Sequence, residues 1–356
     1  MSHNSSINPA VPDAAVIDRA AAILESGGLV AFPTETVYGL GADAENPQAV
    51  AKIYQAKGRP SNHPVIVHIA PEADLAYWVG SVPPEAQKLI DVFWPGPLTL
   101  ILPRAAHIPD AVAGGQDTIG VRCPSHPVAI ALLRAFKGGR GGVAAPSANK
   151  FGHVSPTLAA HVRQEFVQEL QGGTDADGQG ALIGAVLDGG PSQVGIESTI
   201  LDLSRYASHG PVLLRPGHIS AQQIASVLGQ AVHQADAAAP RASGTLASHY
   251  APHTPVVLQG RDMLVQSALQ LQQGGHSFAI LLHQMDAPQG ASAMCRLPAT
   301  AHGYAHDLYA ALRELDGTGS SVILVETPPD GPQWLGVHDR LSRAAHGSEA
   351  VLARLQ

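Results

Sequence analysis

Short apolar runs alternate with amphipathic stretches along the first two thirds of the chain. Residues 14–26 carry apolar side chains at helical spacing and end at a Gly-Gly pair, which predicts a helix. The apolar run 29–32 predicts a short buried strand that stops at Pro33. By the same criteria we expect further helices over residues 47–56, 84–93, 127–136 and 158–170, and further strands over residues 65–69, 98–102, 118–122, 142–144, 182–187, 199–203 and 211–214. This order predicts an α/β sheet covered by helices, and the short connection between the last two strands favours an antiparallel pair there.

The pattern changes near residue 229. Residues 229–248 are rich in Ala, Gln, Ser and Gly and show no apolar periodicity, so we interpret this region as a linker. Beyond it we expect strands over residues 255–258, 278–282 and 322–325 and helices over residues 262–272 and 302–315. A chain of 356 residues is too long for one ordinary domain. We therefore predict an α/β domain at 14–225, a linker at 226–252 and a smaller α/β domain at 253–356.

Composition excludes several classes of protein. The chain has 45% apolar and 14% charged residues, so it can build packed cores. A net charge of −8 disfavours a general nucleic-acid coat but leaves room for a local basic pocket. Two cysteines, Cys123 and Cys295, cannot form a disulfide framework or a Cys-rich zinc site. No apolar run approaches the ~20 residues of a membrane span, and residues 1–12 are polar, so we expect a cytoplasmic protein without membrane contact.

Common catalytic motifs are absent from the sequence. There is no Gly-Lys dipeptide, which excludes a Walker A loop, and no His-Glu-x-x-His or Gly-x-Ser-x-Gly motif. Gly39, Gly41 and Ala44 formally match a dinucleotide fingerprint. However, Arg59 stands about where that motif requires an acidic residue, so we set the match aside.

Polar side chains gather instead at strand ends and in Gly/Pro loops, which are the positions where α/β folds bind ligands. The clusters are residues 32–41, 57–60, 118–124, 145–157, 188–199 and 214–217. Hydroxyls, cations and small residues in such loops suit a polyanion. Single clusters also fit plainer roles: Lys57 and Arg59 could stabilise a helix C-terminus, and His68 could be a hydrogen-bonded core residue. Six clusters in one sheet domain favour a large anion site.

Taken together, these residues resemble the YrdC-type domain of threonylcarbamoyl-AMP synthases. The segment 32–41, the Lys-Gly-Arg at 57–59, the Ser-Ala-Asn at 147–149, and the loops 195–199 and 214–217 stand in the order of that family across residues 14–225. The motifs at 248–252 and 335–345 are similar to the linker and C-terminal motifs of the long form of the enzyme. The resemblance implies a YrdC-like twisted mixed sheet with a concave, positively charged cavity, plus a smaller Rossmann-like α/β C-terminal domain.

The resemblance also implies an activity. L-threonine, bicarbonate and ATP would give threonylcarbamoyl-AMP and pyrophosphate, and the product would serve the N6-threonylcarbamoyladenosine modification beside the anticodon of tRNA. Mg²⁺ would accompany ATP, no organic cofactor is expected, and protein side chains are not expected to hold a metal. The partners implied are the downstream tRNA threonylcarbamoyltransferase machinery and, as a candidate, tRNA itself.

The same resemblance assigns roles to single residues. Those that would hold L-threonine are Thr36, His68, Arg122, Ser147 and Ser198, with Arg122 pairing the carboxylate. Those that would hold ATP are Lys57, Arg59, His63, Thr118, Asn149, Ser155, Arg215 and Tyr250, with Lys57 and Arg59 as the catalytic cations. His63 stands where the family often has Asn, and residues 243–248 lack the Lys/Arg-rich form of some members. No covalent nucleophile is expected, so catalysis would rest on positioning and charge stabilisation.

Three alternatives compete with this interpretation. A YrdC-type module could bind RNA or regulate without making an adenylate, and salt-sensitive RNA binding without ATP turnover would favour that role. A hydrogenase-maturation carbamoyltransferase carries a similar domain behind Cys-rich zinc fingers, which two cysteines cannot build. An α/β domain with an unrelated substrate is the plainest alternative.

Overall fold

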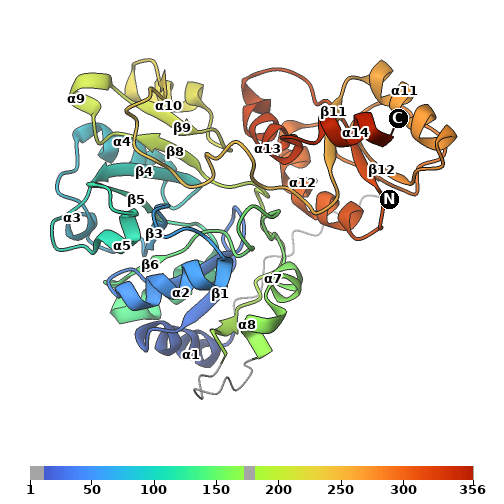
Figure 1. Cartoon of the computed structure of the whole chain (residues 1–356). Coiled ribbons are helices and arrows are strands. Elements are labelled where there is room, and N and C mark those ends of the chain that lie inside the picture. The colour runs from blue at the N-terminus through green and yellow to red at the C-terminus, as the bar shows by residue number, and fades with distance from the viewer. Residues whose placement is uncertain (1–11, 172–180, 356) are drawn as a thin grey trace, which may run out of the picture.

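The chain folds into two α/β units, each built on its own sheet (Figure 1). The computed structural model describes residues 12–171 and 181–355, so the polar stretch 1–12 lies outside the described residues except for Pro12. The described strands form a ten-stranded mixed sheet in the order β10-β9-β8-β4-β5-β3-β6-β2-β1-β7 and a four-stranded sheet in the order β11-β14-β12-β13. The predicted fold class, a mixed sheet with a smaller α/β unit, is confirmed.

Most elements of the large unit lie where the hydrophobic pattern predicts them. Its strands are β1 (Leu29–Phe32), β2 (Gly39–Asp43), β3 (Ile66–Ile69), β4 (Leu98–Pro103), β5 (Thr118–Arg122), β6 (Gly142–Ala144), β7 (Ile183–Val186), β8 (Thr199–Asp202), β9 (Val212–Arg215) and β10 (His233–Gln234). Its helices are α1 (Ala14–Glu25), α2 (Pro47–Lys57), α3 (Leu75–Trp78), α4 (Pro84–Phe93), α5 (Asp110–Ala113), α6 (Pro127–Ala135), α7 (Ala159–Glu165), α8 (Val167–Gln171), α9 (Tyr206–His209) and α10 (Ala221–Leu228).

The interpretation of residues 32–41 as one polar loop is wrong for its last three residues, 39–41. Gly39–Asp43 is strand β2, which pairs antiparallel with β1 and places Gly41 opposite Val30. A side chain at Gly41 would begin 2.7 Å from Val143 and 2.8 Å from Phe32, so this strand is built from small residues and escapes a search for apolar runs.

Strand pairing brings the polar strand ends together. β3 and β5 are parallel, with His68 in register with Arg122. β8 is parallel to β4 and antiparallel to β9, which confirms the antiparallel pair expected near residues 199–214 and sets Arg215 beside Ile200. Residues far apart in sequence therefore meet at one edge of the central strands.

The second unit is a parallel sheet with helices on both faces. Its elements are β11 (Val256–Gln259), α11 (Arg261–Gln273), β12 (Phe278–Leu282), β13 (Ala293–Arg296), α12 (Ala301–Asp316), β14 (Val322–Glu326), α13 (Leu335–Ala345) and α14 (Glu349–Leu355). Strand β13 was not predicted because it is a short edge strand whose side chains alternate between partial and full exposure. One apolar cluster joins the two units, packing Val37 and Ile196 with Leu308 and Val337.

The segment between the units contributes to both. α10 runs to Leu228, and β10 then adds a short parallel strand beside β9. The chain continues to Ala251, which pairs with His153 of the large unit. Within residues 12–171 and 181–355, no helix combines the length and the apolar character needed to cross a membrane.

Candidate active site

A polar cavity lies over the central strand ends of the large sheet. Its volume is about 40 Å³. Ten of the thirteen site residues predicted from the sequence line it: Thr36, Lys57, Arg59, His68, Arg122, Ser147, Asn149, Ser198, Arg215 and Tyr250. Side chains from eight separate stretches of the chain therefore share one hollow.

The other three predicted residues lie around this cavity. Thr118 lines a neighbouring pocket, which shares Ile66 and Ser243 with the main cavity. The His63 ring packs edge-on against Phe151, with centroids 5.6 Å apart. Ser155 is fully buried and donates a hydrogen bond of 2.5 Å to a carboxylate oxygen of Glu197.

Lys57 and Arg59 reach the cavity because α2 ends between them. Asn46 caps the start of the helix, and Gly58 ends it with φ +61°. The Lys57 ammonium donates to the carbonyls of Ser147 (2.5 Å) and Asn149. Burial lowers the pKa of Lys57 well below its ordinary value, and the charge of Arg59 lowers it further.

Arg59 and Arg215 complete a group of three buried cations. Arg59 Nη2 donates to the Pro64 carbonyl at 2.9 Å and to Ser243 Oγ at 3.3 Å. Arg215 donates to the Ser198 carbonyl through Nε (3.1 Å) and Nη2 (3.0 Å), and to the Ser243 carbonyl through Nη1 (2.8 Å). Burial lowers the pKa of Arg59 to about 10 and lowers that of Arg215 as well. Such crowded, desolvated positive charge is favourable only opposite an anion.

Arg122 is a fourth cation that lines the cavity. Its Nε donates to the Gly96 carbonyl (3.2 Å), Nη1 to Thr36 Oγ1 (2.9 Å) and Nη2 to Glu35 Oε1 (2.6 Å). A guanidinium has five N–H groups, so two are left without an acceptor among the described residues. The second Glu35 oxygen accepts the Ser125 N–H at 3.0 Å, which fixes this carboxylate on both sides.

His68 is a neutral neighbour of Arg122. Burial, followed by the charge of Arg122, lowers the pKa of His68 to about 3. Among the described residues its Nδ1 has no hydrogen-bond partner. The imidazole therefore faces the site uncharged at neutral pH.

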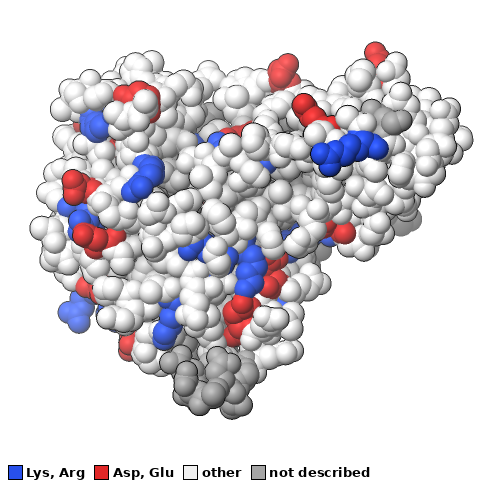
Figure 2. All heavy atoms as spheres, viewed as in Figure 1, with Lys and Arg blue, Asp and Glu red and all other residues white. Residues whose placement is uncertain are grey.

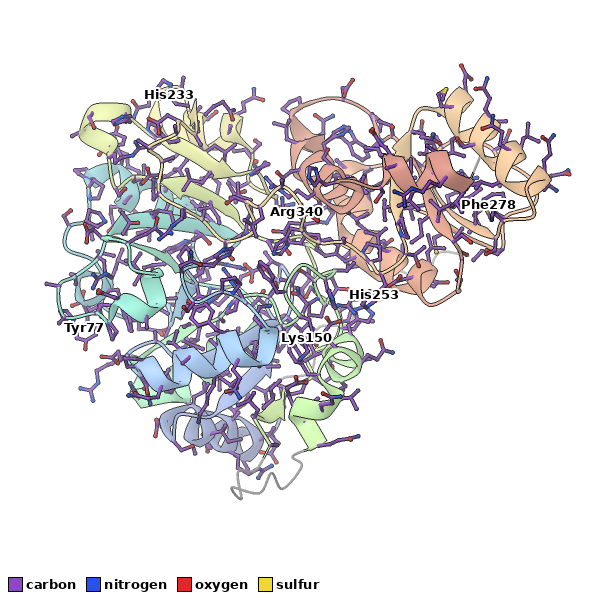
Figure 3. The ribbon with its side chains drawn as sticks, in the orientation of Figure 1. Tyr77, Lys150, His233, His253, Phe278 and Arg340 are labelled. Carbon is purple, nitrogen blue, oxygen red and sulfur yellow. The ribbon has the colours of Figure 1, made fainter. Side chains whose placement is uncertain are left out.

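The site list drawn from the sequence missed Glu197, although the cluster 188–199 contains it. Its carboxylate lines the cavity and accepts hydrogen bonds from Ser155, from Tyr309 (3.0 Å) and from Arg340 Nε (2.7 Å). Burial raises the pKa of Glu197, but the charges of Arg340 and Arg215 outweigh it and bring the pKa to about 2. Figure 3 shows Arg340 at the junction of the two units.

A strap, which we define as residues 243–250, covers the cavity. Ser243, Gly244, His249 and Tyr250 all line it. Tyr250 has φ +61° and is 1% exposed, with its ring stacked on Tyr309 at 5.8 Å and under the Arg340 guanidinium at 5.2 Å. The strap is thus held by side chains of the second unit while its own atoms occupy donors of Arg59 and Arg215.

A mixed sheet with a buried cationic cavity, joined to a second parallel α/β unit, is the architecture of a YrdC-type enzyme with an added C-terminal domain. A family model described as "Telomere recombination" matches residues 22–217, and one described as "Threonylcarbamoyl-AMP synthase, C-terminal domain" matches residues 219–346. The threonylcarbamoyl-AMP synthase of Bacillus subtilis is 41% identical over 349 residues, 93% of each chain. That of Pyrococcus abyssi is 38% identical over 338 residues, 92% of this chain and 93% of the relative.

A solved structure of Pyrococcus abyssi Sua5 complexed with L-threonine has a TM-score of 0.82 to this chain, with 36% identity, and the match covers 94% of this chain and 95% of the other. The chain belongs to the two-domain threonylcarbamoyl-AMP synthase family of nucleotidyltransferases. The resemblance and the enzyme class predicted from the sequence are confirmed.

Proposed function

We propose that this chain makes threonylcarbamoyl-AMP and pyrophosphate from L-threonine, bicarbonate and ATP, and that the product serves N6-threonylcarbamoyladenosine modification of tRNA. The observation that carries the proposal is the shared cavity. Three buried cations line it together with Arg122, which has two N–H groups without an acceptor among the described residues. A nucleoside triphosphate would fit beside the three cations, and the carboxylate of a small amino acid would fit beside Arg122.

The threonine end is built around Arg122. Its two remaining N–H groups would pair the carboxylate of L-threonine, as guanidinium forks do. Thr36 is hydrogen-bonded to Arg122, the hydroxyl residues Ser147 and Ser198 line the same cavity, and the neutral His68 adds a polar group without repelling the amine. The presence of L-threonine in the solved Pyrococcus abyssi structure supports this assignment.

The nucleotide end is built around Lys57, Arg59 and Arg215, and Asn149 lines the same cavity. The cations would neutralise the triphosphate and stabilise charge on the departing pyrophosphate. The amine of threonine would take up the carboxyl group of bicarbonate with loss of water. An oxygen of the resulting carbamate would attack the α-phosphorus, the bond from that phosphorus to the bridging β-phosphate oxygen would break, and pyrophosphate would leave. Ser243 now accepts from Arg59 and Arg215, so ATP entry would displace the strap, and its return would exclude water from the labile carbamate.

No group of three or more His, Cys, Asp or Glu side chains in the described ranges could hold a metal ion. Glu197, the acidic residue among the cavity-lining residues described above, is already bound by Ser155, Tyr309 and Arg340. We propose that magnesium enters as part of the ATP substrate.

The RNA-binding alternative has less support. On the face shown in Figure 2, Lys and Arg side chains are interspersed with Asp and Glu rather than gathered into one basic patch. A tRNA partner would instead be reached through the downstream threonylcarbamoyltransferase, in the cytoplasm where ATP and tRNA are available.

Pyrophosphate release by the purified full-length protein tests the proposal. Release should require ATP, L-threonine and bicarbonate together, and mass spectrometry should detect threonylcarbamoyl-AMP. Equal release with threonine or bicarbonate omitted would refute the scheme. Salt-sensitive RNA binding with no ATP turnover would establish the alternative.

A further inference from the structure

The carboxyl ends of the four parallel strands in the second unit lie at one edge. Gln259, the last residue of β11, pairs with Glu326, the last of β14, and Leu282 of β12 pairs with Arg296 of β13. In open parallel α/β sheets, ligands bind in the crevice outside this edge, where loop amides and helix N-termini meet an anion.

Three consecutive backbone amides converge on Glu326. The N–H groups of His283 and Gln284 donate to Glu326 Oε2 at 2.6 and 2.9 Å, and that of Met285 donates to both carboxylate oxygens at 3.2 Å. Arg261, the first residue of α11, donates from Nε to Oε1 at 3.2 Å. A run of amides around one anion is the geometry of a backbone anion nest.

The loop that carries these amides is held from the opposite side. Arg296 donates to the carbonyls of His283 (3.4 Å) and Met285 (2.8 Å), so the peptide groups are oriented with their amides toward Glu326. The His283 ring packs edge-on against Tyr304 and Trp334, with centroids 5.6 and 5.3 Å away. The nest is therefore rigid and backed by aromatic side chains.

Glu326 is enclosed in this arrangement rather than solvated. The residue is 2% exposed. Burial raises the pKa of its carboxyl, but the amides of His283, Met285 and Gln284 and the charge of Arg261 outweigh that effect, so the pKa lies below its ordinary value. The carboxylate is therefore charged at neutral pH.

We propose that the second unit contains an oxyanion-binding site that is filled by the chain's own carboxylate, Glu326. The chemical class that fits the site is a carboxylate or phosphate group with two oxygens to share among three amides and one guanidinium. In the wild-type protein the site is closed to external anions, and the internal anion stabilises the edge of the sheet. The proposal does not depend on the substrates assigned to the cavity of the large unit.

Chemical rescue tests this site. Glu326→Ala removes the internal anion and leaves the nest intact, so its thermal midpoint should fall by several degrees. Acetate or inorganic phosphate, compared with chloride at the same ionic strength, should then raise the midpoint of Glu326→Ala more than that of the wild type. The matched control is Glu349→Ala, because Glu349 is an exposed carboxylate of the same unit. An identical response of both variants to acetate and phosphate would overturn the proposal.

A second variant keeps the test decisive if Glu326→Ala does not fold. Glu326→Gln preserves the size of the side chain but removes its charge and turns an NH₂ group toward amide donors. Hydrogen exchange at the amides of His283, Gln284 and Met285 should be at least several-fold faster in Glu326→Gln than in the wild type, with exchange in β12 itself changed less. Unchanged protection of these three amides would overturn the proposal.

Discussion

Glu197 of the large unit and Arg340 of the second unit form a buried ion pair with Nε and Oε2 2.7 Å apart. Arg340 also donates to the backbone carbonyls of Glu197 and Pro216, and its guanidinium lies over the Tyr250 ring. One side chain of the second unit therefore contacts the cavity wall and the strap together. The two units form a single site structurally, even though their sheets are separate.

Arg340→Met should destabilise the protein by about 3–5 kcal/mol, because it leaves the Glu197 carboxylate buried without its charge partner. Urea unfolding measures this loss, and Arg354→Met, at an exposed arginine, is the control. The double variant Glu197→Gln/Arg340→Met should lose much less than the two single losses combined. Strict additivity would show that the pair is not energetically coupled.

Gly244→Ala should open the strap. Gly244 has φ +77°, and a Cβ there would lie 1.9 Å from Tyr250 Oη and 2.9 Å from Arg215 Nη1. We expect a large loss of kcat/KM for adenylate formation and faster proteolytic cleavage within residues 243–250. Gly229→Ala is the matched control, because Gly229 has φ +70° but a Cβ there meets nothing within 4 Å. Equal effects of the two variants would mean that backbone strain, and not strap closure, is responsible.

Glu35→Gln should weaken threonine binding. Glu35 holds Arg122 Nη2 at 2.6 Å and the Ser125 amide at 3.0 Å, so the neutral side chain loosens the orientation of the guanidinium. We expect KM for L-threonine to rise roughly tenfold, which corresponds to about 1.4 kcal/mol, with a smaller change in KM for ATP. Glu72→Gln, at an exposed glutamate paired with Arg134, should change neither. A larger effect on ATP than on threonine would contradict the assignment of this end of the cavity.

Arg59→Ala should separate activity from stability. The charges of Lys57 and Arg215 face Arg59, so removing its guanidinium relieves repulsion in the free protein. Adenylate formation should fall by about 10²–10³-fold, the usual cost of losing one transition-state donor, while the unfolding midpoint should stay level or rise. A lower midpoint together with substantial remaining activity would show that Arg59 is structural.

Stability should fall with acidification well above the range in which carboxylates titrate. Burial lowers the pKa of both His68 and His249 to about 3 in the folded chain, against an ordinary value of 6.5. Above pH 6.5 both states are neutral at these residues, whereas between 6.5 and 3 only the unfolded chain takes up the protons. Each histidine then lowers the free energy of unfolding by up to ~1.4 kcal/mol for every pH unit of acidification in this range. Urea unfolding at pH 7.5 and 5.5 measures the slope, and His68→Gln should reduce it; an unchanged slope would contradict this account.

The hydrophobic pattern was sufficient for elements that bury a continuous apolar run or an amphipathic face. β12 and β5 have the bounds predicted from the sequence, and α2 ends one residue after its predicted end. It failed at β2, where Gly41 fills a place too tight for a side chain, and at β13, an edge strand with exposed Met294. Periodicity is read from large apolar side chains, so a buried strand made mostly of small residues and an edge strand with exposed side chains both escape it.

The site residues also divide into those that the local sequence predicts and those that it does not. Residue chemistry and motif order predicted Lys57, Arg59, Arg122 and Arg215, because cations at strand and helix ends are conspicuous in a sequence of low charge. Glu197 has the same sequence neighbourhood as Ser198, yet its role depends on Arg340, 143 positions away. No local pattern carries that information.

By itself, the sequence determined the α/β class, the family and ten of the residues that line the cavity, because these follow from local burial patterns and from motifs a few residues long. Only the tertiary structure decided which donors are already occupied, which acids are paired and how the strap is held. Those properties arise from distances between groups remote along the chain, and desolvation then sets their charge states.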